Sequence, residues 1–490
     1  MPCAMKKLNR RSFLRHSVLV GATLSAWSPL AWAAPRARIR GANEDIRIAV
    51  VGFNGRGRNH IDGFRKLKGV RVVALCDVDA DVLARGVREF EQRNETVAAY
   101  RDVRKLLEDA NVDAVAFATP NHWHALGAIW AIQAGKDVYL EKPVSHNVWE
   151  GRKIVEAARK YHRIVQTGTQ ARSSSSLAEA FAWLREGHLG QILRARGFCY
   201  KRRPSIGKVD GPQPIPASVD YDLWCGPAPK EPLMRKRLHY DWHWVWPTGN
   251  GDLGNQGVHQ MDLCRWALGQ NQLAPAVWSI GGRLGYEDDG TTPNTQIVFL
   301  DYRPAPLIFE VRGLPANPAK GDEMDTYRGV RVGVIIECEA GYLVVKNYTS
   351  AEAYENNGEL IRKFEGVRDH FENFIRAVRS RKPSDLTADI LEGHLSAGLC
   401  HLGNISYRLG QKLPPEAIRD AIRQNNDLAE AFGRMEEHLK ANAVDLIQTP
   451  ATLGALLKFD PRREKFLNHP AANELLTRQY RPPFVVPEKV

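Results

Sequence analysis

Short apolar runs alternate with amphipathic stretches from residue 46 to residue 167. The runs are bounded by turn residues and predict buried strands over residues 46–51, 70–75, 112–118, 137–140 and 164–167. The amphipathic stretch 149–161 predicts a helix before the last of these strands. Strands that alternate with helices in this way indicate an α/β domain over residues 46–167.

The pattern changes at residue 168, where strands rich in aromatic and β-branched residues follow one another. They are predicted over residues 192–200, 276–283, 296–300, 308–311, 333–337 and 341–345, and their succession favours an open, largely antiparallel sheet. Amphipathic helices are predicted over residues 367–379, 387–408 and 428–441, and short helical pieces with a proline-rich end beyond residue 450. We therefore expect an α+β domain over residues 168–410 and a helical C-terminal extension over residues 411–490.

The N-terminal segment has the pattern of an export signal. Asn9-Arg10-Arg11-Ser12-Phe13 is a twin-arginine motif, residues 17–32 are apolar but too short for a dependable membrane span, and residues 31–33 read A-x-A. We predict a twin-arginine signal peptide over residues 1–33 and a linker over 34–45, which makes the mature protein periplasmic or secreted. The alternative is a basic amphipathic N-terminus that is never cleaved.

The charge and the cysteines of the sequence indicate which partners and which covalent links to expect. The formal charge is +12, and the first 33 residues contribute five cations and no acid, which leaves +7 for the remaining chain. Because acids are interleaved with bases nearly throughout, nucleic acid is not an expected partner, and no stable membrane span is expected after cleavage. The six remaining cysteines would permit disulfides in an oxidising compartment, but their wide spacing and apolar neighbours favour free thiols.

A glycine-rich turn follows the first predicted strand. The turn reads Gly52-Phe53-Asn54-Gly55-Arg56-Gly57, and such a turn lets backbone N–H groups at a helix N-terminus approach a pyrophosphate. Asp77 ends the second strand 25 residues after Gly52, where a carboxylate accepts hydrogen bonds from a ribose diol and repels a 2′-phosphate. We therefore expect a Rossmann domain that binds NAD, with NADP less favoured; the alternative is a Rossmann-like unit without a nucleotide.

The next two strands end in polar residues. Thr119, Pro120, Asn121 and His124 follow the strand 112–118, at the edge of the sheet where ligands bind in such folds. The strand 137–140 ends in Glu141-Lys142-Pro143, a charged pair fixed by proline at the edge of the predicted cleft. We interpret this pair as functional, against the alternative of a strand-terminating turn with a solvated lysine.

Residues 249–269 combine a glycine-dense start with a polar stripe. If one helix begins near residue 252, then Asn255, His259, Asp262 and Trp266 share one of its faces. A polar stripe that points into protein is typical of a helix that lines a catalytic pocket. The alternative is a core helix with a hydrogen-bonded histidine.

An aromatic run precedes this helix. Residues 239–246 include Asp241, Trp242 and His243, and tryptophan at this density in a loop can wall a pocket for a sugar ring. A satellite hydrophobic cluster under a long loop is the alternative. No metal is expected, because the alternating His239, Asp241 and His243 have no evident fourth ligand.

Together, the dinucleotide-binding start, Glu141-Lys142-Pro143 and the glycine-led G-x-H-x-x-D segment resemble the Gfo/Idh/MocA oxidoreductase family, relatives of glucose–fructose oxidoreductase and inositol dehydrogenase. The resemblance covers residues 46–410, and the leader and extension resemble a secreted branch. It implies that the cofactor contacts the turn through Gly52, Asn54, Gly55, Arg56 and Gly57, the ribose site through Asp77, the wall through Thr119, Pro120, Asn121 and His124, and the nicotinamide end through Glu141 and Lys142. It also implies that His259 is the catalytic acid/base, and a homo-oligomer formed through the C-terminal sheet.

The sequence departs from the family at Asn255. Family members commonly carry aspartate four residues before the histidine, and an asparagine can orient an imidazole but cannot stabilise imidazolium by ion pairing. His259 therefore has a weaker partner, or Asp252, Asp241 or Asp262 substitutes, or the chemistry has changed. We count Lys142, His259 and Asn255 as catalytic candidates and Asp241, Trp242, His243 and Asp262 as substrate-binding candidates.

The expected reaction is hydride transfer between a hydroxyl of a sugar, glycoside or cyclitol and a nicotinamide. His259 would take the hydroxyl proton, and Lys142 would stabilise the developing alkoxide. An exported enzyme meets little free NAD, so the cofactor is expected to be tightly bound and recycled. One alternative is an NAD-dependent glycosidase or lyase that uses transient ring oxidation. Another is a non-catalytic sugar or nucleotide sensor on the same fold.

Overall fold

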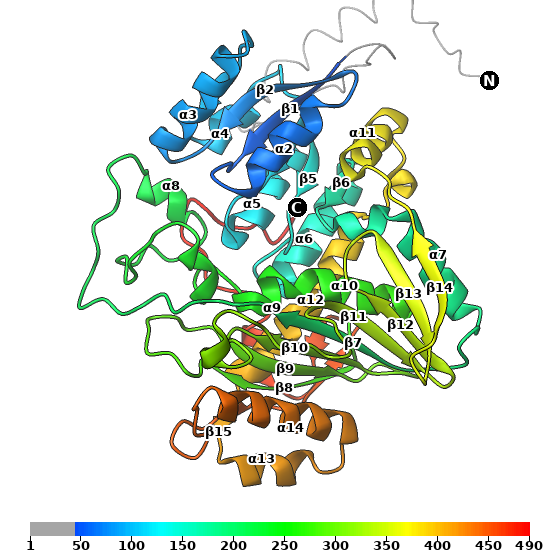
Figure 1. Cartoon of the computed structure of the whole chain (residues 1–490). Coiled ribbons are helices and arrows are strands. Elements are labelled where there is room, and N and C mark those ends of the chain that lie inside the picture. Colours follow the sequence, from blue (N-terminus) through cyan, green and yellow to red (C-terminus); the bar gives the residue numbers. More distant parts are fainter. Residues whose placement is uncertain (1–44) are drawn as a thin grey trace, which may run out of the picture. The chain divides into compact units, whose positions relative to one another are not determined.

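The computed structural model describes residues 45–490, apart from the side chain of Lys320, as two β-sheets with helices packed on them (Figure 1). One sheet has six strands and the other has twelve. The predicted signal peptide, its cleavage site and the linker up to residue 44 lie outside the described residues. No helix within residues 45–490 is long and apolar enough to cross a membrane.

The six-stranded sheet is parallel throughout and has the strand order β3-β2-β1-β4-β5-β6. The sequence analysis predicted every strand except β3, which is too short to show a period. The order reverses between β1 and β4, and open α/β sheets bind ligands at such a reversal. The strands are β1 Ile46–Val51, β2 Val70–Cys76, β3 Ala98–Tyr100, β4 Ala114–Phe117, β5 Asp137–Leu140 and β6 Val165–Thr167.

Helices cover both faces of this sheet. Apolar side chains of α2, α3 and α11 form the core on one face, and those of α4, α5 and α6 form it on the other. The proline-rich C-terminus returns to the second face, where Phe484 packs against Trp123 and Trp130 of α5 with ring centroids 5.6 and 6.3 Å apart. The helices are α2 Arg56–Arg65, α3 Ala80–Glu91, α4 Val103–Leu107, α5 Asn121–Gln133, α6 Val148–Lys160 and α11 His370–Ser380.

The twelve-stranded sheet is mixed and mostly antiparallel. Its main path is β14-β13-β12-β11-β7-β10-β9-β8-β16-β15, β17 also pairs with β8 and with β18, and β7 and β10 run parallel. The strands are β7 Ile192–Tyr200, β8 Ala276–Gly282, β9 Thr295–Leu300, β10 Leu307–Arg312, β11 Val332–Cys338, β12 Gly341–Val345, β13 Ser350–Glu355, β14 Leu360–Glu365, β15 Gln411–Lys412, β16 Thr452–Leu453, β17 Leu457–Asp460 and β18 Lys465–Phe466. This sheet and the parallel sheet confirm the predicted fold class.

One face of the twelve-stranded sheet packs on helices that also approach the parallel sheet. The shared apolar core joins the sheet to α7, α9, α10 and α12, and α12 also contacts α6. In Figure 1, α9, α10 and α12 lie between the two sheets, and α7 lies beside β13 and β14. The bounds of the four helices are α7 Ser175–Arg185, α9 Gly251–Asn255, α10 Gly257–Ala267 and α12 Ile390–Arg408; two further short helices are α8 Tyr221–Cys225 and α15 Pro470–Glu474.

The sequence analysis expected a helical C-terminal extension, but the extension also contains strands. Helix α14 (Asn426–Ala441) was predicted, but α13 (Pro415–Ile422) was not, and β15 to β18 add strands to the sheet. In Figure 1, α13 and α14 (orange) lie on the opposite side of β8 to β10 from α10 and α12. Their apolar residues form a separate core with that face of the sheet.

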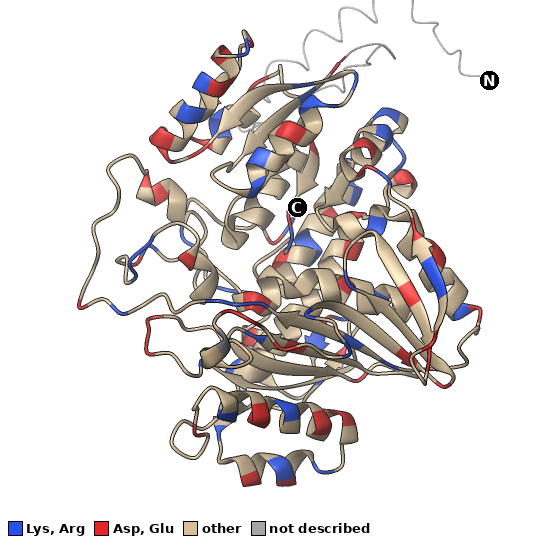
Figure 2. Ribbon diagram, in the orientation of Figure 1, with Lys and Arg blue, Asp and Glu red and all other residues tan. Residues whose placement is uncertain are grey.

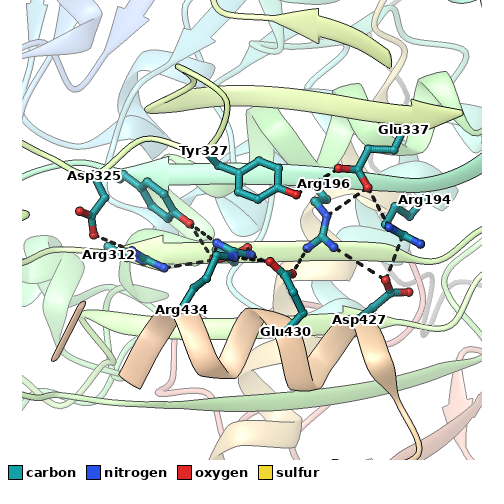
Figure 3. Close-up of polar contacts among 11 residues, drawn as sticks. Arg194, Arg196, Arg312, Asp325, Tyr327, Glu337, Asp427, Glu430 and Arg434 are labelled. Carbon is teal, nitrogen blue, oxygen red and sulfur yellow. Dashed lines mark hydrogen bonds and ion pairs between the residues drawn. The ribbon is translucent and has the colours of Figure 1, made fainter. Parts of the chain in front are cut away.

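A network of charged side chains also ties α14 to the sheet (Figure 3). Glu310 on β10 is 2 % exposed and accepts hydrogen bonds from Arg434 of α14 and from the Tyr200 hydroxyl, the latter at 2.7 Å. Glu430 of α14 forms a 3.0 Å ion pair with Arg196 on β7. The helices therefore exclude this face of β8 to β10 from any interface between subunits, and the homo-oligomer stays a prediction.

We expect Arg434→Met to destabilise the protein by about 3 kcal/mol, because the substitution leaves the buried carboxylate of Glu310 without its principal cation. Urea unfolding checks this. In the control Arg419→Met, the lost partner is Glu436 in an exposed pair, and the expected loss is below about 1 kcal/mol. Equal losses in the two variants would show that burial of the network does not matter.

The described residues agree with two further predictions. The six cysteines within residues 45–490 are free and buried, as their spacing and apolar neighbours suggested. Acidic and basic side chains are interspersed over the ribbon (Figure 2), which matches the interleaved charges of the sequence.

Candidate active site

A cavity of about 410 Å³ lies at the carboxyl ends of β1, β2, β4 and β5, next to the reversal of strand order. Residues that follow each of these strands line it, together with the aromatic loop that the sequence analysis singled out. Asn255, at the end of α9, lines it from the second domain. The cavity therefore brings together most of the residues predicted from separate motifs.

The glycine turn leaves the N-terminus of α2 open towards this cavity. Gly52 has a φ of +74°, and a Cβ there would lie 3.0 Å from the Thr119 backbone. Gly55 faces open space, and α2 begins without a side-chain cap or an acid in its first turn. Gly57 does not line the cavity; a Cβ there would lie 2.2 Å from the Gly52 carbonyl oxygen, so its role is close packing of helix and turn.

Other residues of the turn and the second strand line the cavity as predicted. Asn54 and Arg56 flank Gly55. Asp77 follows β2, and its carboxylate accepts hydrogen bonds from the backbone N–H groups of Phe53 at 3.2 Å and Asp79 at 3.1 Å. Burial raises the pKa of Asp77. These bonds fix the carboxylate at the strand end, where it can meet a ribose.

The segment after β4 forms one wall of the cavity. Thr119, Pro120, Asn121 and His124 all line it, and Thr119 Oγ1 is buried without a hydrogen-bond partner among the described residues. His124 is anchored between two carbonyl oxygens, with Nδ1 2.6 Å from that of Pro143 and Nε2 2.8 Å from that of Thr119. Burial lowers the pKa of His124. This wall is rigid, and it offers the Thr119 hydroxyl to a ligand.

Glu141 and Lys142 are held by residues from distant parts of the chain. Glu141 is 4 % exposed, and its Oε1 accepts hydrogen bonds of 2.9 Å from Arg56 Nε and His60 Nε2. Burial opposes ionisation, but the hydrogen bond from His60 and the charges of Arg56 and Lys142 hold the pKa of Glu141 well below its usual value. Burial lowers the pKa of Lys142, and the Glu141 carboxylate opposes that shift.

The Lys142 side chain contacts the predicted catalytic helix at a break in that helix. The sequence analysis expected one helix from residue 252, but the structure has α9 and α10 with a turn at Gln256. Lys142 Nζ donates a 2.8 Å hydrogen bond to the Asn255 carbonyl oxygen, and the N–H of His259 instead donates to Gln256 O at 3.2 Å. In a continuous helix the Asn255 carbonyl oxygen would accept the His259 N–H; here it accepts the hydrogen bond from Lys142 instead.

His259 does not line the cavity. It is 6 % exposed, its ring centroid is 4.9 Å from that of Tyr348, and its Nδ1 has no partner among the described residues. Burial, and after it the positive charge of Lys142, lower the pKa of His259 to about 3. The imidazole is therefore neutral, and it is not among the side chains that line the cavity.

None of the predicted partners of His259 is hydrogen-bonded to it. Asn255 Nδ2 donates to Asp252 at 3.4 Å. The three acids proposed as substitutes each pair with an arginine: Asp252 with Arg203, Asp241 with Arg237 and Asp262 with Arg172, at 2.7 to 2.9 Å. Asp241 and Asp262 are 1 % exposed and do not line the cavity, so their predicted contact with substrate is not seen.

The aromatic loop covers the cavity from the other side. Trp242 and His243 line it as predicted and stack on each other with centroids 3.6 Å apart. Burial lowers the pKa of His243 to about 3. His239 and Tyr240 also line the cavity, and no group of histidine, cysteine and acid within residues 45–490 could hold a metal ion.

Some lining residues were missed by the sequence analysis. Arg101 and Asp102 reach the cavity from the end of β3, which was too short to be recognised. His60, which holds Glu141, lies four residues after Arg56 on α2, and this helical spacing was a signal that could have found it.

The residues of the cavity fit a nicotinamide dinucleotide. The uncapped helix with an open Gly55 suits the pyrophosphate, Asp77 suits a ribose, and the unpartnered Thr119 hydroxyl suits a polar group of the ligand. The fold and the site thus define a dinucleotide-binding oxidoreductase with a second domain built on a mostly antiparallel sheet.

Comparison with known proteins identifies the family. Residues 46–169 match the model described as "Oxidoreductase family, NAD-binding Rossmann fold", and residues 187–303 match its "C-terminal alpha/beta domain". The chain belongs to the Gfo/Idh/MocA oxidoreductase family.

Individual relatives are distant. The chain is 28 % identical over 225 residues to a glycosyl hydrolase family 109 protein of Shewanella pealeana, which covers 42 % of this chain and 49 % of that protein. It is 27 % identical over 264 residues to myo-inositol 2-dehydrogenase of Thermotoga maritima, covering 54 % and 66 %. These matches thus span about half to two thirds of each relative.

A solved structure shows the same fold. The WlbA dehydrogenase from Bordetella pertussis, in complex with NADH and UDP-GlcNAcA, aligns with a TM-score of 0.56 at 20 % identity, over 74 % of this chain and 97 % of that one.

Proposed function

We propose that this protein is an exported, NAD-dependent oxidoreductase that oxidises a hydroxyl group of a sugar, glycoside or cyclitol. The observation that carries the proposal is Lys142, which lines the cavity beside Glu141 and is held by the Asn255 carbonyl of the second domain. The relatives support this substrate class, because one is named myo-inositol 2-dehydrogenase and one structure contains NADH and UDP-GlcNAcA.

Lys142 is the acid/base group in this proposal. A bound nicotinamide supplies the hydride acceptor. Lys142 in its neutral form takes the hydroxyl proton, and the ammonium that results stabilises the remaining negative charge on the substrate oxygen. The sequence analysis gave the proton to His259, but a buried imidazole outside the cavity suits positioning, and we assign it that role.

The cofactor is proposed to be tightly bound and recycled, because free NAD is scarce outside the cytoplasm. The test is to purify the protein from a periplasmic extract, denature it and identify released dinucleotide by mass spectrometry. We expect NAD or NADH near one equivalent per chain. A cofactor-free protein that also fails to bind added NAD would overturn the redox proposal, and recovery from the cytoplasm alone would overturn export.

Asp77 is proposed to select NAD. We expect Asp77→Asn to weaken NAD binding by about tenfold or more, since charge-assisted bonds to the ribose are lost, and to weaken NADP binding less. Titration calorimetry with both dinucleotides measures this. The exposed Asp81→Asn is the matched control, and an unchanged NAD-to-NADP ratio in Asp77→Asn would contradict the assignment.

A second candidate function is NAD-dependent glycoside cleavage. The observation in its favour is the glycosyl hydrolase family 109 relative. Transient oxidation at a ring carbon acidifies the neighbouring C–H and permits elimination of the glycosidic group. Lys142 would accept the hydroxyl proton in the oxidation step, pass that proton to the departing glycosidic oxygen through solvent, and then be free to accept the C–H proton. Release of nitrophenol from a nitrophenyl glycoside without net NADH would favour this function; net NADH without cleavage would favour the dehydrogenase.

A further inference from the structure

A second cavity, of about 360 Å³, lies on the other side of Asn250 from the dinucleotide cavity. Asn250 lines it, and Asn250 Oδ1 accepts a 2.9 Å hydrogen bond from Asn121, which lines the first cavity. Helix α12 supplies His401, Asn404 and Arg408, and the chain after α15 supplies Arg478. The hydrogen bond between Asn121 and Asn250 thus connects the linings of the two cavities, which have no residue in common.

Arg408 offers its guanidinium to this cavity. It lies over the ring of Trp246, with Cζ 5.2 Å from the ring centroid, and it has no hydrogen bond or ion pair within residues 45–490. Burial and the nearby charge of Arg478 lower the pKa of Arg408. An arginine against an aromatic ring, with its five N–H donors unused by the protein, is arranged for an oxyanion.

Arg478 is the second cation. Its Nη1 is 3.1 Å from His146 Nδ1, and its Nη2 donates to the Pro247 carbonyl oxygen at 3.0 Å. Among the described residues it has no carboxylate ion-pair partner, and burial lowers its pKa. These two contacts fix the guanidinium at the cavity and leave further donors for a ligand.

The nearby acids offset only part of the charge of this pair, because Glu150 and Glu231 act on Arg478 while no acid within residues 45–490 pairs with Arg408. Glu150 is fully buried, and its oxygens accept hydrogen bonds from His146 N at 2.8 Å, Asn147 Nδ2 at 3.0 Å and the Tyr480 hydroxyl at 3.0 Å. Glu474 is exposed at the rim and makes no ion pair within the described part of the chain. The cavity therefore keeps an excess of positive charge.

The floor of the cavity offers an acceptor. Asn404 is 4 % exposed, and its Nδ2 donates to Asn250 O at 2.9 Å, while its Oδ1 is buried without a partner among the described residues. Burial lowers the pKa of the neighbouring His401 to about 3, so this ring adds no charge. A hydroxyl donor from a ligand would satisfy Asn404 Oδ1.

We propose that this second cavity binds a small hydroxylated carboxylate, of the aldonate or uronate class. The planar forks of Arg408 and Arg478 suit a carboxylate, and Asn404 Oδ1 suits a ligand hydroxyl. The volume is in the range of small-molecule sites. This site is separate from the proposed hydroxyl oxidation and does not depend on it.

Titration calorimetry of the full chain saturated with NAD tests the proposal, with gluconate and glucuronate as probes and glucose and inorganic phosphate for comparison. We expect saturable binding of at least one acid. We expect Arg408→Gln and Arg478→Gln each to weaken it by about tenfold or more. The controls Arg423→Gln, exposed beyond α13, and Lys142→Met in the first cavity should leave it unchanged.

Several outcomes would overturn the proposal. One is the absence of saturable binding of either acid at about 10 mM. Another is equal affinity of the two cavity variants and the unaltered protein for the acid. A third is loss of binding in Lys142→Met, which would place the acid in the first cavity. Phosphate or glucose that binds as tightly as the acids would overturn the carboxylate class. Because the Arg408 side chain makes no hydrogen bond or ion pair within residues 45–490, Arg408→Gln should fold normally, and it should keep its affinity for NAD.

Discussion

We expect Lys142→Met to lower NAD-dependent turnover by on the order of 10² to 10⁴, while the affinity for NAD stays within a few-fold of the unaltered protein. Methionine keeps the unbranched shape and most of the length of the side chain but can neither accept the hydroxyl proton nor carry charge. Glu141 keeps its hydrogen bonds from Arg56 and His60, so the cofactor wall should remain in place. The measurement is steady-state kinetics with a substrate found in a panel of sugars, glycosides and cyclitols.

The pH profile gives an independent readout. Because burial lowers the pKa of Lys142, the neutral base forms below the ordinary lysine pKa of 10.5. The value of kcat/KM should therefore rise with pH through the pKa of Lys142 and then level off. Lys142→Met should abolish this acid limb together with the activity.

His259→Ala decides between the two candidate bases. If Lys142 is the base and His259 only helps to position it, we expect a loss of about tenfold and a retained acid limb that is shifted in pH, since removal of the imidazole changes the surroundings of the lysine. A loss as large as that of Lys142→Met, with the limb abolished, would restore His259 to the role that the sequence alone suggested.

The parallel sheet was predictable because its strands are buried on both faces and appear as continuous apolar runs. β14 was not, because its first four residues are all exposed although two are apolar and two basic, so the residue types do not alternate as in a half-buried strand. Pairing with β13 makes it a strand. The strands of the extension have two to four residues each. β16 and β17 are strands because they pair with β8, and β15 and β18 because they pair with β16 and β17. Such elements depend on tertiary contacts that leave no local period.

The predictions for the site also succeeded for local motifs and failed for contacts between distant parts of the chain. Residues that lie next to one another in the chain, such as Glu141-Lys142 and the glycine turn apart from Gly57, do line the cavity as predicted. The partners of Asp252 and Asp262 were not predictable, because Arg203 and Arg172 come from 49 and 90 residues away. The break between α9 and α10 was missed for the same reason, since the hydrogen bond from Lys142 at Asn255 spans 113 residues.

Buried neutral histidines should make the protein sensitive to mild acid. Burial lowers the pKa of His122, His259 and His401 to about 3 and that of His370 to about 4, and each is at most 6 % exposed. In the unfolded chain these groups titrate near 6.5. Below that pH the unfolded state therefore binds more protons than the folded state, and the free energy of unfolding decreases as the pH is lowered. Between pH 7.5 and 5.5 each histidine should cost about 1.3 kcal/mol, or about 5 kcal/mol together.

Urea unfolding at pH 7.5 and pH 5.5 measures this loss, and the variant His122→Gln tests its cause. His122 is the clearest choice because its Nε2 is 2.9 Å from the Trp224 carbonyl oxygen, and glutamine can donate there without titrating. The variant should lose about 1.3 kcal/mol less than the unaltered protein over this pH interval, whatever its stability at pH 7.5. The half-exposed His188→Gln is the control, and it should leave the pH dependence of stability unchanged. A free energy of unfolding that is independent of pH over this interval would mean that the histidines take up protons in the folded protein, and hence that water reaches them.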